Sequence, residues 1–227
     1  MLPPFKIRID SGLCDRLRVI FSFQNPMRRQ GRELMVCWKP NDACPGHFLD
    51  VFEPIPGIHF TEDPTGIDWD DNRGDENNDP RMKYLLHDLQ PRPFLWDRIA
   101  VVRQQLQPDY IAVHVRRTDK LQTETANELT TDAEFFRFCD HRRRGAEKLF
   151  LACDNAETQA QFQARYPEHL VVAAPITPTT ALRQTDLAHA VVDMFVCAQA
   201  RDYLGTNLSG YSILVETMYR EYRQKKR

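Results

Sequence analysis

Short apolar segments alternate with longer amphipathic ones along the second half of the chain, and this alternation restricts the fold more than any other feature. The apolar segments are DYIAVHV (109–115), KLFLACD (148–154), LVVAAP (170–175) and DYLGTN (202–207). Helical spacing of apolar residues around them predicts helices over 93–106, 130–145, 155–167, 185–200 and 209–224. Strands that alternate with helices predict a parallel, doubly wound α/β sheet that binds ligands at the carboxyl ends of its strands.

Capping residues mark the ends of two of these helices. Thr131 or Asp132 is expected to cap the second helix, and Gly145 to end it. Thr185 or Asp186 is expected to cap the fourth.

The first part of the chain has the same pattern at a smaller size. A strand at 5–10, a helix at 16–30, a glycine turn and a strand at 33–38 form one βαβ unit, and 47–60 has room for a short helix and a further strand. Residues 61–80 are acidic and have almost nothing to bury, which predicts a loop or a disordered insert. We therefore expect two Rossmann-like lobes with parallel sheets.

The expected lobes differ in size: a reduced N-terminal lobe covers residues 1–90 and a C-terminal lobe covers 91–227. A formal net charge of −2 and a pI near 6.4 give no electrostatic reason to expect nucleic acid or an anionic membrane as the partner. No apolar stretch approaches the ~20 residues that cross a bilayer, and the N-terminus has no signal-peptide core. A soluble, cytoplasmic protein is expected, and its oligomeric state is left open.

The six cysteines and seven histidines show no CxxC, HExxH or H-x₃₋₅-H spacing. Small buried thiols explain the cysteines better than a disulfide framework or a zinc site. We therefore expect no metal and no cofactor.

A dense group of charges follows the first apolar strand of the C-terminal lobe. Arg116 and Arg117 are adjacent, and the planar guanidinium fork of arginine suits phosphate oxygens. Neighbouring residues of a strand point to opposite sides, so one arginine is expected to face a ligand while the other pairs with Asp119 or braces the loop. The alternative is a surface cluster of salt bridges.

Two other strand ends are expected at the same edge of the sheet, at Asp154 and Thr206. In GTNLSGYS (205–212), Thr206, Ser209 and the amides that open the last helix can form an anion pocket, although a serine there can also be a plain N-cap. Together with the arginines, these residues make a diphosphate a suitable ligand. Neither a GxxxxGK[ST] motif nor a strand followed by GxGxxG is present, which disfavours an ATPase or a common dinucleotide enzyme.

Two carboxylates remain open to more than one interpretation. Asp193 lies in the apolar helical run AVVDMFV, where it either caps a local group or binds the N1–H and 2-amino edge of a guanine. Glu124 follows the arginines and is either solvated or a general base for an acceptor hydroxyl.

Several of these segments resemble one enzyme family. VHVRRTDKLQTE (113–124) closely resembles the signature loop of core α1,6-fucosyltransferases and rhizobial nodulation fucosyltransferases and, more distantly, of protein O-fucosyltransferases. LFLACDNAETQAQFQARYP (149–167) and VVDMFVCAQARDYLGTNLS (191–209) resemble the segments that follow in those enzymes. SGLCDRLRVIFSF (11–23) is similar to the GGLGNRL opening of many microbial and viral members.

The resemblance implies a GT-B architecture and inverting, metal-independent transfer of L-fucose from GDP-β-L-fucose to a hydroxyl of a glycan acceptor, with the small N-terminal lobe on the acceptor side. By position, Arg116 corresponds to the arginine on the β-phosphate, and Lys120 and Glu124 to the lysine and the proposed base of the α1,6 branch. The catalytic candidates are thus Arg116, Lys120 and Glu124, and the candidates for donor binding are His114, Arg116, Asp154, Asp193, Thr206, Ser209 and Gly12.

The chain departs from the family at one motif, because Cys14 and Asp15 replace the glycine and the asparagine of GGLGNRL. An anionic Asp15 next to a diphosphate is unfavourable unless it pairs with Arg16 or faces the acceptor. Two other functions stay open: a catalytically silent relative that binds a nucleotide sugar or glycan, and a transferase that uses a different GDP-sugar.

Overall fold

The computed structural model describes residues 2–70, 88–117, 129–176 and 185–225. The chain divides into two compact units, Met1–Arg92 and Pro93–Arg227. Each unit has its own sheet.

The first unit is built on a four-stranded sheet in the order β3-β2-β1-β4, in which all paired strands run parallel. The elements are β1 (Phe5–Arg8), α1 (Leu13–Arg29), β2 (Leu34–Cys37), α2 (Phe48–Val51), β3 (Ile58–Thr61) and β4 (Trp69–Asp70). The βαβ unit predicted for this part of the chain is confirmed, although the helix starts three residues earlier than its spacing indicated.

The acidic segment 61–80 is not a loop throughout its described part. β4 lies inside it and pairs with β1, with Ile7 opposite Trp69. The Trp69 side chain is 9% exposed, and its ring lies 5.1 Å from the ring of Phe23 in α1. The composition of the segment misled the prediction because one large aromatic residue supplies enough apolar surface to place a short strand. Residues 71–80 lie outside the described part.

The second unit is a parallel sheet in the order β7-β6-β5-β8. The elements are α3 (Pro93–Leu106), β5 (Tyr110–Val115), α4 (Asp132–Arg142), β6 (Lys148–Cys153), α5 (Ala156–Arg165), β7 (Leu170–Val171), α6 (Leu187–Ala198), β8 (Asp202–Gly205) and α7 (Gly210–Lys225). Strands and helices alternate as predicted, so the α/β class with a parallel sheet in each lobe is confirmed.

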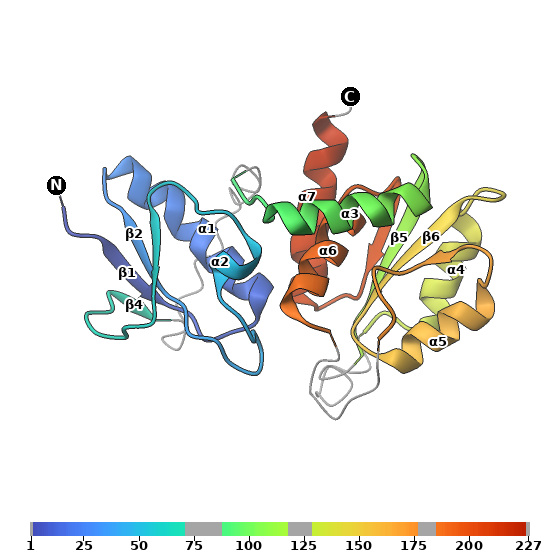
Figure 1. Cartoon of the computed structure of the whole chain (residues 1–227), viewed down its shortest axis with the longest axis horizontal. Coiled ribbons are helices and arrows are strands. Elements are labelled where there is room, and N and C mark those ends of the chain that lie inside the picture. Colours follow the sequence, from blue (N-terminus) through green and yellow to red (C-terminus); the bar gives the residue numbers. More distant parts are fainter. Residues whose placement is uncertain (1, 71–87, 118–128, 177–184, 226–227) are drawn as a thin grey trace. The chain divides into compact units, whose positions relative to one another are not determined.

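The two faces of this sheet are covered by different helices (Figure 1). Ile111, Val113 and Val115 of β5 pack in one apolar cluster with residues of α4 and α5. Side chains of a strand alternate between faces, so Tyr110 and His114 point the other way, toward α6 and α7. Tyr110 donates a hydrogen bond from Oη to the carbonyl of Val196 in α6, over 2.7 Å.

Helix ends follow the predicted caps at the N-terminal side and differ at the C-terminal side. Thr131 and Asp186 are the N-caps of α4 and α6, and their side chains accept hydrogen bonds from the first-turn amides. Gly145 does not end α4, which stops at Arg142. Gly145 instead takes the left-handed conformation in the turn before β6, with φ of +52°. β7 is also shorter than the apolar run LVVAAP predicted.

All six cysteines are buried and form no disulfide, as expected for small core thiols. Among the described helices, none is long and apolar enough to span a bilayer.

Candidate functional site

A small cavity lies at the carboxyl end of β5 in the unit Pro93–Arg227. It encloses about 60 Å³, the volume of roughly two water molecules. The lining residues come from two strand ends, from α6 and the segment just before it, and from α7: His114, Arg116, Cys153, Asp154, Thr185, Ala190, Asp193 and Tyr211. Four of the residues predicted for donor binding therefore meet at one place, as expected for the carboxyl edge of a parallel sheet.

His114 is fixed in the wall of this cavity by two contacts. Its Nδ1 lies 2.7 Å from the Ser212 hydroxyl, and its ring stacks on Tyr211 with centroids 4.3 Å apart. Burial, followed by the charges of Arg116 and Arg117, lowers the pKa of His114 to about 3. The imidazole is therefore neutral at physiological pH and suits hydrogen bonding to an uncharged polar group of a ligand.

Gly205 explains how α7 comes close enough to His114. Gly205 lies opposite His114 in the β5–β8 pairing. A Cβ at this position would lie 2.5 Å from the Cβ of Ser212, closer than real side chains approach. Only glycine lets the first turn of α7 pack against the strand, and this packing places Ser212 and Tyr211 on the histidine.

Arg116 leaves β5 in a conformation set by Thr206. The Thr206 hydroxyl accepts a hydrogen bond from the Arg116 amide at 2.9 Å and donates one to the carbonyl of His114 at 3.0 Å. The Thr206 side chain is fully buried. In this structure Thr206 orients the strand end, and the half-exposed Arg116 lines the cavity.

Arg117 connects the end of β5 to the start of α4. Its Nη2 lies 2.6 Å from Asp132 and 2.8 Å from the carbonyl oxygen of Thr130, both next to the start of α4. Its amide donates to Asp154 Oδ1 at 3.0 Å, so this oxygen of a predicted donor residue is used within the chain. The two arginines do different work, as their alternation predicts. The pairing partner, however, is Asp132, and Asp119 lies outside the described residues.

Asp193 is the most unusual group in the cavity. Its side chain is buried, and within the described chain its Oδ1 has no hydrogen-bond partner. Oδ2 lies 3.6 Å from Nε2 of His189, one helical turn earlier in α6. Burial raises the pKa of Asp193 well above its ordinary value. A buried carboxyl with an unpartnered acceptor oxygen gains from an N–H donor of a ligand, because leaving a buried polar atom without a partner costs free energy.

Ser209 and Gly12 have local structural roles. Ser209 is fully buried just before α7, and its hydroxyl accepts a weak hydrogen bond from the Ser212 amide at 3.4 Å. This is the contact of a plain N-cap. Gly12 belongs to the other unit, where it is the N-cap of α1 with φ of −71°. Whether either residue binds the donor stays a prediction.

The substituted motif of the first unit also has a defined geometry. Asp15 does not pair with Arg16; its carboxylate lies 3.3 Å from Arg18. Arg16 is buried, donates to the carbonyls of Ser11 and Lys39 at 2.7 and 3.0 Å, and so ties two loops together. Asp15 thus lies on the solvent side of α1, where half of its side chain is exposed.

Two of the catalytic candidates, Lys120 and Glu124, lie outside the described residues. Their roles stay predictions. Within the described part of the chain, no three His, Cys, Asp or Glu side chains come together as metal ligands do.

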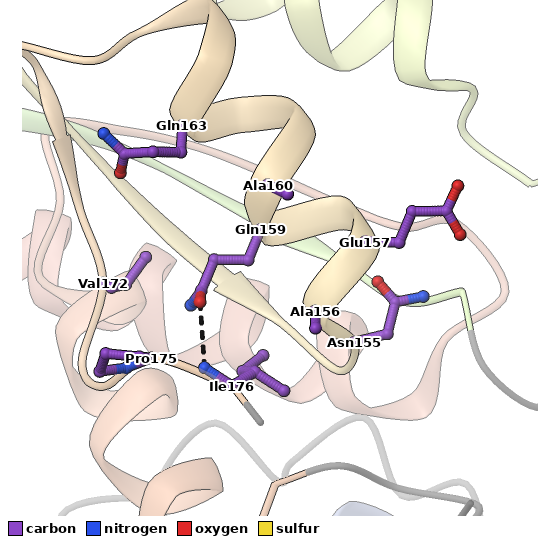
Figure 2. Close-up of a pocket in the computed structure, with 9 residues that line it drawn as sticks. All are labelled: Asn155, Ala156, Glu157, Gln159, Ala160, Gln163, Val172, Pro175 and Ile176. Atoms are coloured by element: carbon purple, nitrogen blue, oxygen red, sulfur yellow. Dashed lines mark hydrogen bonds between the residues drawn. The ribbon is translucent and has the colours of Figure 1, made fainter. Parts of the chain in front are cut away.

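A larger hollow of about 780 Å³ lies beside α5 and is shown in Figure 2. The Gln159 side chain crosses it and binds the chain after β7 at both ends of its amide, donating to Ala174 O and accepting from the Ile176 amide. Glu157 and Asn155 point away from that segment. Among the described residues that line it, Glu157 is the only titratable one, so this hollow offers less chemistry than the smaller cavity.

Tyr211 and Ser212 are the site residues that sequence reasoning missed. The sequence pattern places both in a helix start and gives neither a role in binding. What brings them to His114 is the close approach that Gly205 allows, and only the packed structure shows it. The one signal in the sequence is the short spacing from Gly205 at the end of the strand to the first turn of the helix.

Comparison with known proteins gives this cavity a context. No protein-family model matches the chain. Among solved structures, the chain resembles the α1,6-fucosyltransferase NodZ co-crystallised with GDP, with a TM-score of 0.64, 15% identity, and coverage of 95% of this chain and 92% of that one. NodZ has been solved from Bradyrhizobium. POFUT1 in complex with GDP gives a TM-score of 0.61 at 8% identity, covering 97% of this chain and 96% of that one.

These structural likenesses show the fold, and the expected GT-B-like architecture is thereby confirmed. A sequence match adds to it: an α-(1,6)-fucosyltransferase of Drosophila melanogaster is 27% identical over 157 residues. The chain is therefore similar in fold to NodZ and POFUT1 and in sequence to an α-(1,6)-fucosyltransferase. The sequence match takes in 61% of this chain but 25% of the fly protein, so the chain spans about a quarter of that relative.

Proposed function

We propose that the protein transfers L-fucose from GDP-β-L-fucose to a hydroxyl group of a glycan, with inversion and without a metal ion. The observation that carries the proposal is the cavity at the end of β5, where the cationic Arg116 and the buried Asp193 line one space. A nucleoside diphosphate sugar has matching parts: an anionic diphosphate and a base with N–H donors.

The structures that resemble this chain support the choice of donor. NodZ has been crystallised with GDP and, in a second form, soaked with GDP-fucose; that form matches this chain with a TM-score of 0.63, 15% identity, and coverage of 96% of this chain and 93% of that one. In the proposal, Asp193 and the neutral His114 bind the guanosine part, and Arg116 binds the diphosphate. The start of α7 adds its partial positive charge at the same edge of the sheet.

The chemistry follows from the charge that develops during transfer. When the bond between the sugar and the diphosphate breaks, the leaving GDP gains negative charge, and a fixed guanidinium lowers the energy of that state. Thr206 contributes by holding the backbone of Arg116, so the arginine needs little reorganisation. Glu124 is proposed to take the proton of the attacking hydroxyl from the opposite face, and Lys120 is proposed as a further catalytic residue.

A thermal-unfolding series tests the donor assignment. GDP, GDP-fucose, GDP-mannose, UDP and ADP are each added to the wild-type protein and to Arg116→Ala. A ligand at 100 times its Kd should add about 2.7 kcal/mol to the free energy of unfolding. We expect protection by the guanosine nucleotides and its loss in Arg116→Ala. Arg137→Ala, which changes an exposed arginine of α4, is the matched control and should keep the protection.

Protection by UDP or ADP without protection by GDP would overturn the donor assignment. Release of GDP from GDP-fucose is then followed with a panel of glycan acceptors. Glu124→Gln should slow this release at least ~100-fold if Glu124 is the base. Binding of GDP-fucose with no turnover on any acceptor would favour the catalytically silent relative. A higher rate with GDP-mannose than with GDP-fucose would mean that the transferred sugar is mannose.

A further inference from the structure

His189 has no part in the mechanism above, although its side chain is buried on the same side of α6 as that of Asp193. His189 is not among the described residues that line the cavity, whereas Asp193 is. Nε2 of His189 lies 3.6 Å from Oδ2 of Asp193, while Oδ1 is the buried oxygen without a hydrogen-bond partner. The oxygen near the histidine and the unpartnered oxygen are therefore different.

We propose that His189 takes up the proton that Asp193 releases when the N–H donors of a nucleobase occupy the cavity. The inference deepens the proposed function, on which it rests. In the transfer, the O–H bond at Oδ2 breaks and a new N–H bond forms with the lone pair of Nε2. The products are a carboxylate that faces the ligand and an imidazolium behind it, and no other reactant is needed.

The protonation state of Asp193 before ligand binding makes this transfer necessary. A buried carboxyl group with too few hydrogen-bond partners is more stable as the neutral acid than as the carboxylate. Burial raises the pKa of Asp193 accordingly. An N–H donor on the ligand instead favours the carboxylate, because a protonated acid offers a weaker acceptor. Burial also lowers the pKa of His189, so its imidazole is available as a base before the ligand binds.

The other titratable neighbours of Asp193 are poor acceptors for the proton. Cys153 at the end of β6 and Cys197 in α6 are buried thiols whose pKa values are raised, so they already hold their protons. His114 is surrounded by two cationic arginines and bonded to Ser212. Arg98 of α3 is a cation that lowers the pKa of both members of the pair.

One further charge favours His189 as the acceptor. Asp186, the N-cap of α6, lies close enough to raise the pKa of His189 and so offsets part of the effect of burial. Among the described residues, His189 is thus a base within ion-pair distance of the Asp193 carboxyl, and the charge of Asp186 makes it a stronger base. His189 acts on the ligand through Asp193, so it is a positioning residue.

Calorimetry of GDP-fucose binding measures the proton directly. Titrations are run near pH 7 in two buffers with different ionisation enthalpies, and the difference gives the number of protons released per ligand bound. GDP-fucose is preferred to GDP because its sugar ester blocks the terminal phosphate, which would itself titrate near pH ~6. The wild type should release close to no proton, because the transfer stays inside the protein.

His189→Asn should bind GDP-fucose more weakly and release about one proton, since asparagine cannot take it up. Its Kd should fall about tenfold for each unit that the pH rises between about 6.5 and 8, whereas the wild-type Kd should change little. His189→Gln serves if the asparagine variant unfolds. Asp193→Asn in the His189→Asn background should abolish the proton release, and the exposed His141→Asn should behave as the wild type.

Equal proton release by the wild type and the His189 variant would overturn the inference, and so would a Kd of His189→Asn that does not depend on pH. A wild-type protein that binds no GDP-fucose would overturn the proposed function instead. The two failures are therefore distinguishable.

Discussion

His114 shows how one residue of a buried strand is adapted to a binding cavity. Its neighbours in β5 on the opposite face are aliphatic and pack in the core. The histidine faces α7, where Ser212 fixes one ring nitrogen and Tyr211 covers a ring face. Burial and two arginines keep the ring neutral, which makes it part of the polar lining without adding a charge.

The neutral state of His114 predicts how stability depends on pH. Its pKa is about 3 in the folded protein and near the ordinary 6.5 in the unfolded chain. The unfolded chain therefore binds more protons between these values, and the free energy of unfolding falls as the pH drops below about 6.5, by at most ~1.4 kcal/mol per pH unit for this group.

His114→Asn, which keeps a hydrogen-bonding group near Ser212, should reduce this slope in urea unfolding measured from about pH 7 to about pH 4. The pKa of His189 is also lowered, so the variant should keep the smaller part of the slope that His189 contributes. The exposed His141→Asn is the control and should leave the slope unchanged. An unaltered slope in His114→Asn would show that this residue is not held neutral.

At the scale of the elements, the two ends of the second sheet have different roles. The carboxyl end of β5 carries the cavity, while the opposite end is closed by an ion pair. Arg201, just before β8, donates to both carboxylate oxygens of Glu147, just before β6, at 2.8 Å each. Arg201 also donates to the last residue of α4, Arg142, and its carbonyl accepts from Tyr219 of α7.

Glu147→Gln should destabilise the protein by roughly 3 kcal/mol, because it leaves the largely buried Arg201 without its main carboxylate. The hydrogen bond from Arg201 lowers the pKa of Glu147, so this contribution is present above the ordinary pKa and is lost as the pH falls through the folded value. The difference between wild type and variant should therefore shrink in acid.

Chemical denaturation at neutral and at acidic pH measures both effects. Glu216→Gln breaks an exposed ion pair with Arg220 on α7 and should cost less than about 1 kcal/mol. Equal losses for the two variants would contradict the structural role of Glu147.

At the scale of the whole molecule, the chain has two α/β units and a fold similar to that of NodZ and POFUT1. In the proposed reaction, Arg116 and the start of α7 stabilise the negative charge of the leaving GDP, and the carboxylate of Glu124 takes the proton of the acceptor. A metal ion that bridged the diphosphate would do the same work as Arg116.

Donor turnover should therefore keep its initial rate when EDTA is added to the protein and the assay buffer. A metal ion in this role contributes several kcal/mol to catalysis, so its removal would reduce the rate by orders of magnitude. Loss of the rate with EDTA and its recovery with Mg²⁺ or Mn²⁺ would contradict metal independence. Wild-type protein with added Mg²⁺ and no chelator is the reference.

Much of the architecture is predictable from signals that are local in the sequence. Apolar periodicity located most strands and helices, and capping chemistry located the starts of α4 and α6, since both signals depend on residues close in sequence. The end of α4 and the strand β4 were predicted wrongly. The helix end is not set by Gly145, and β4 exists because Trp69 packs on residues distant in sequence.

The sequence by itself determined the alternating α/β pattern, the strand ends that meet at one edge, and the residue types suited to a diphosphate. Only the tertiary structure decided which of these residues line the cavity and which support it. Thr206 and Arg117 hold backbone, whereas His114, Asp193 and Tyr211 line the cavity. His189 of α6 does not line it but lies 3.6 Å from Asp193. The reason is physical: burial, neutralisation and pairing depend on neighbours that folding brings together, and these are not encoded in local spacing.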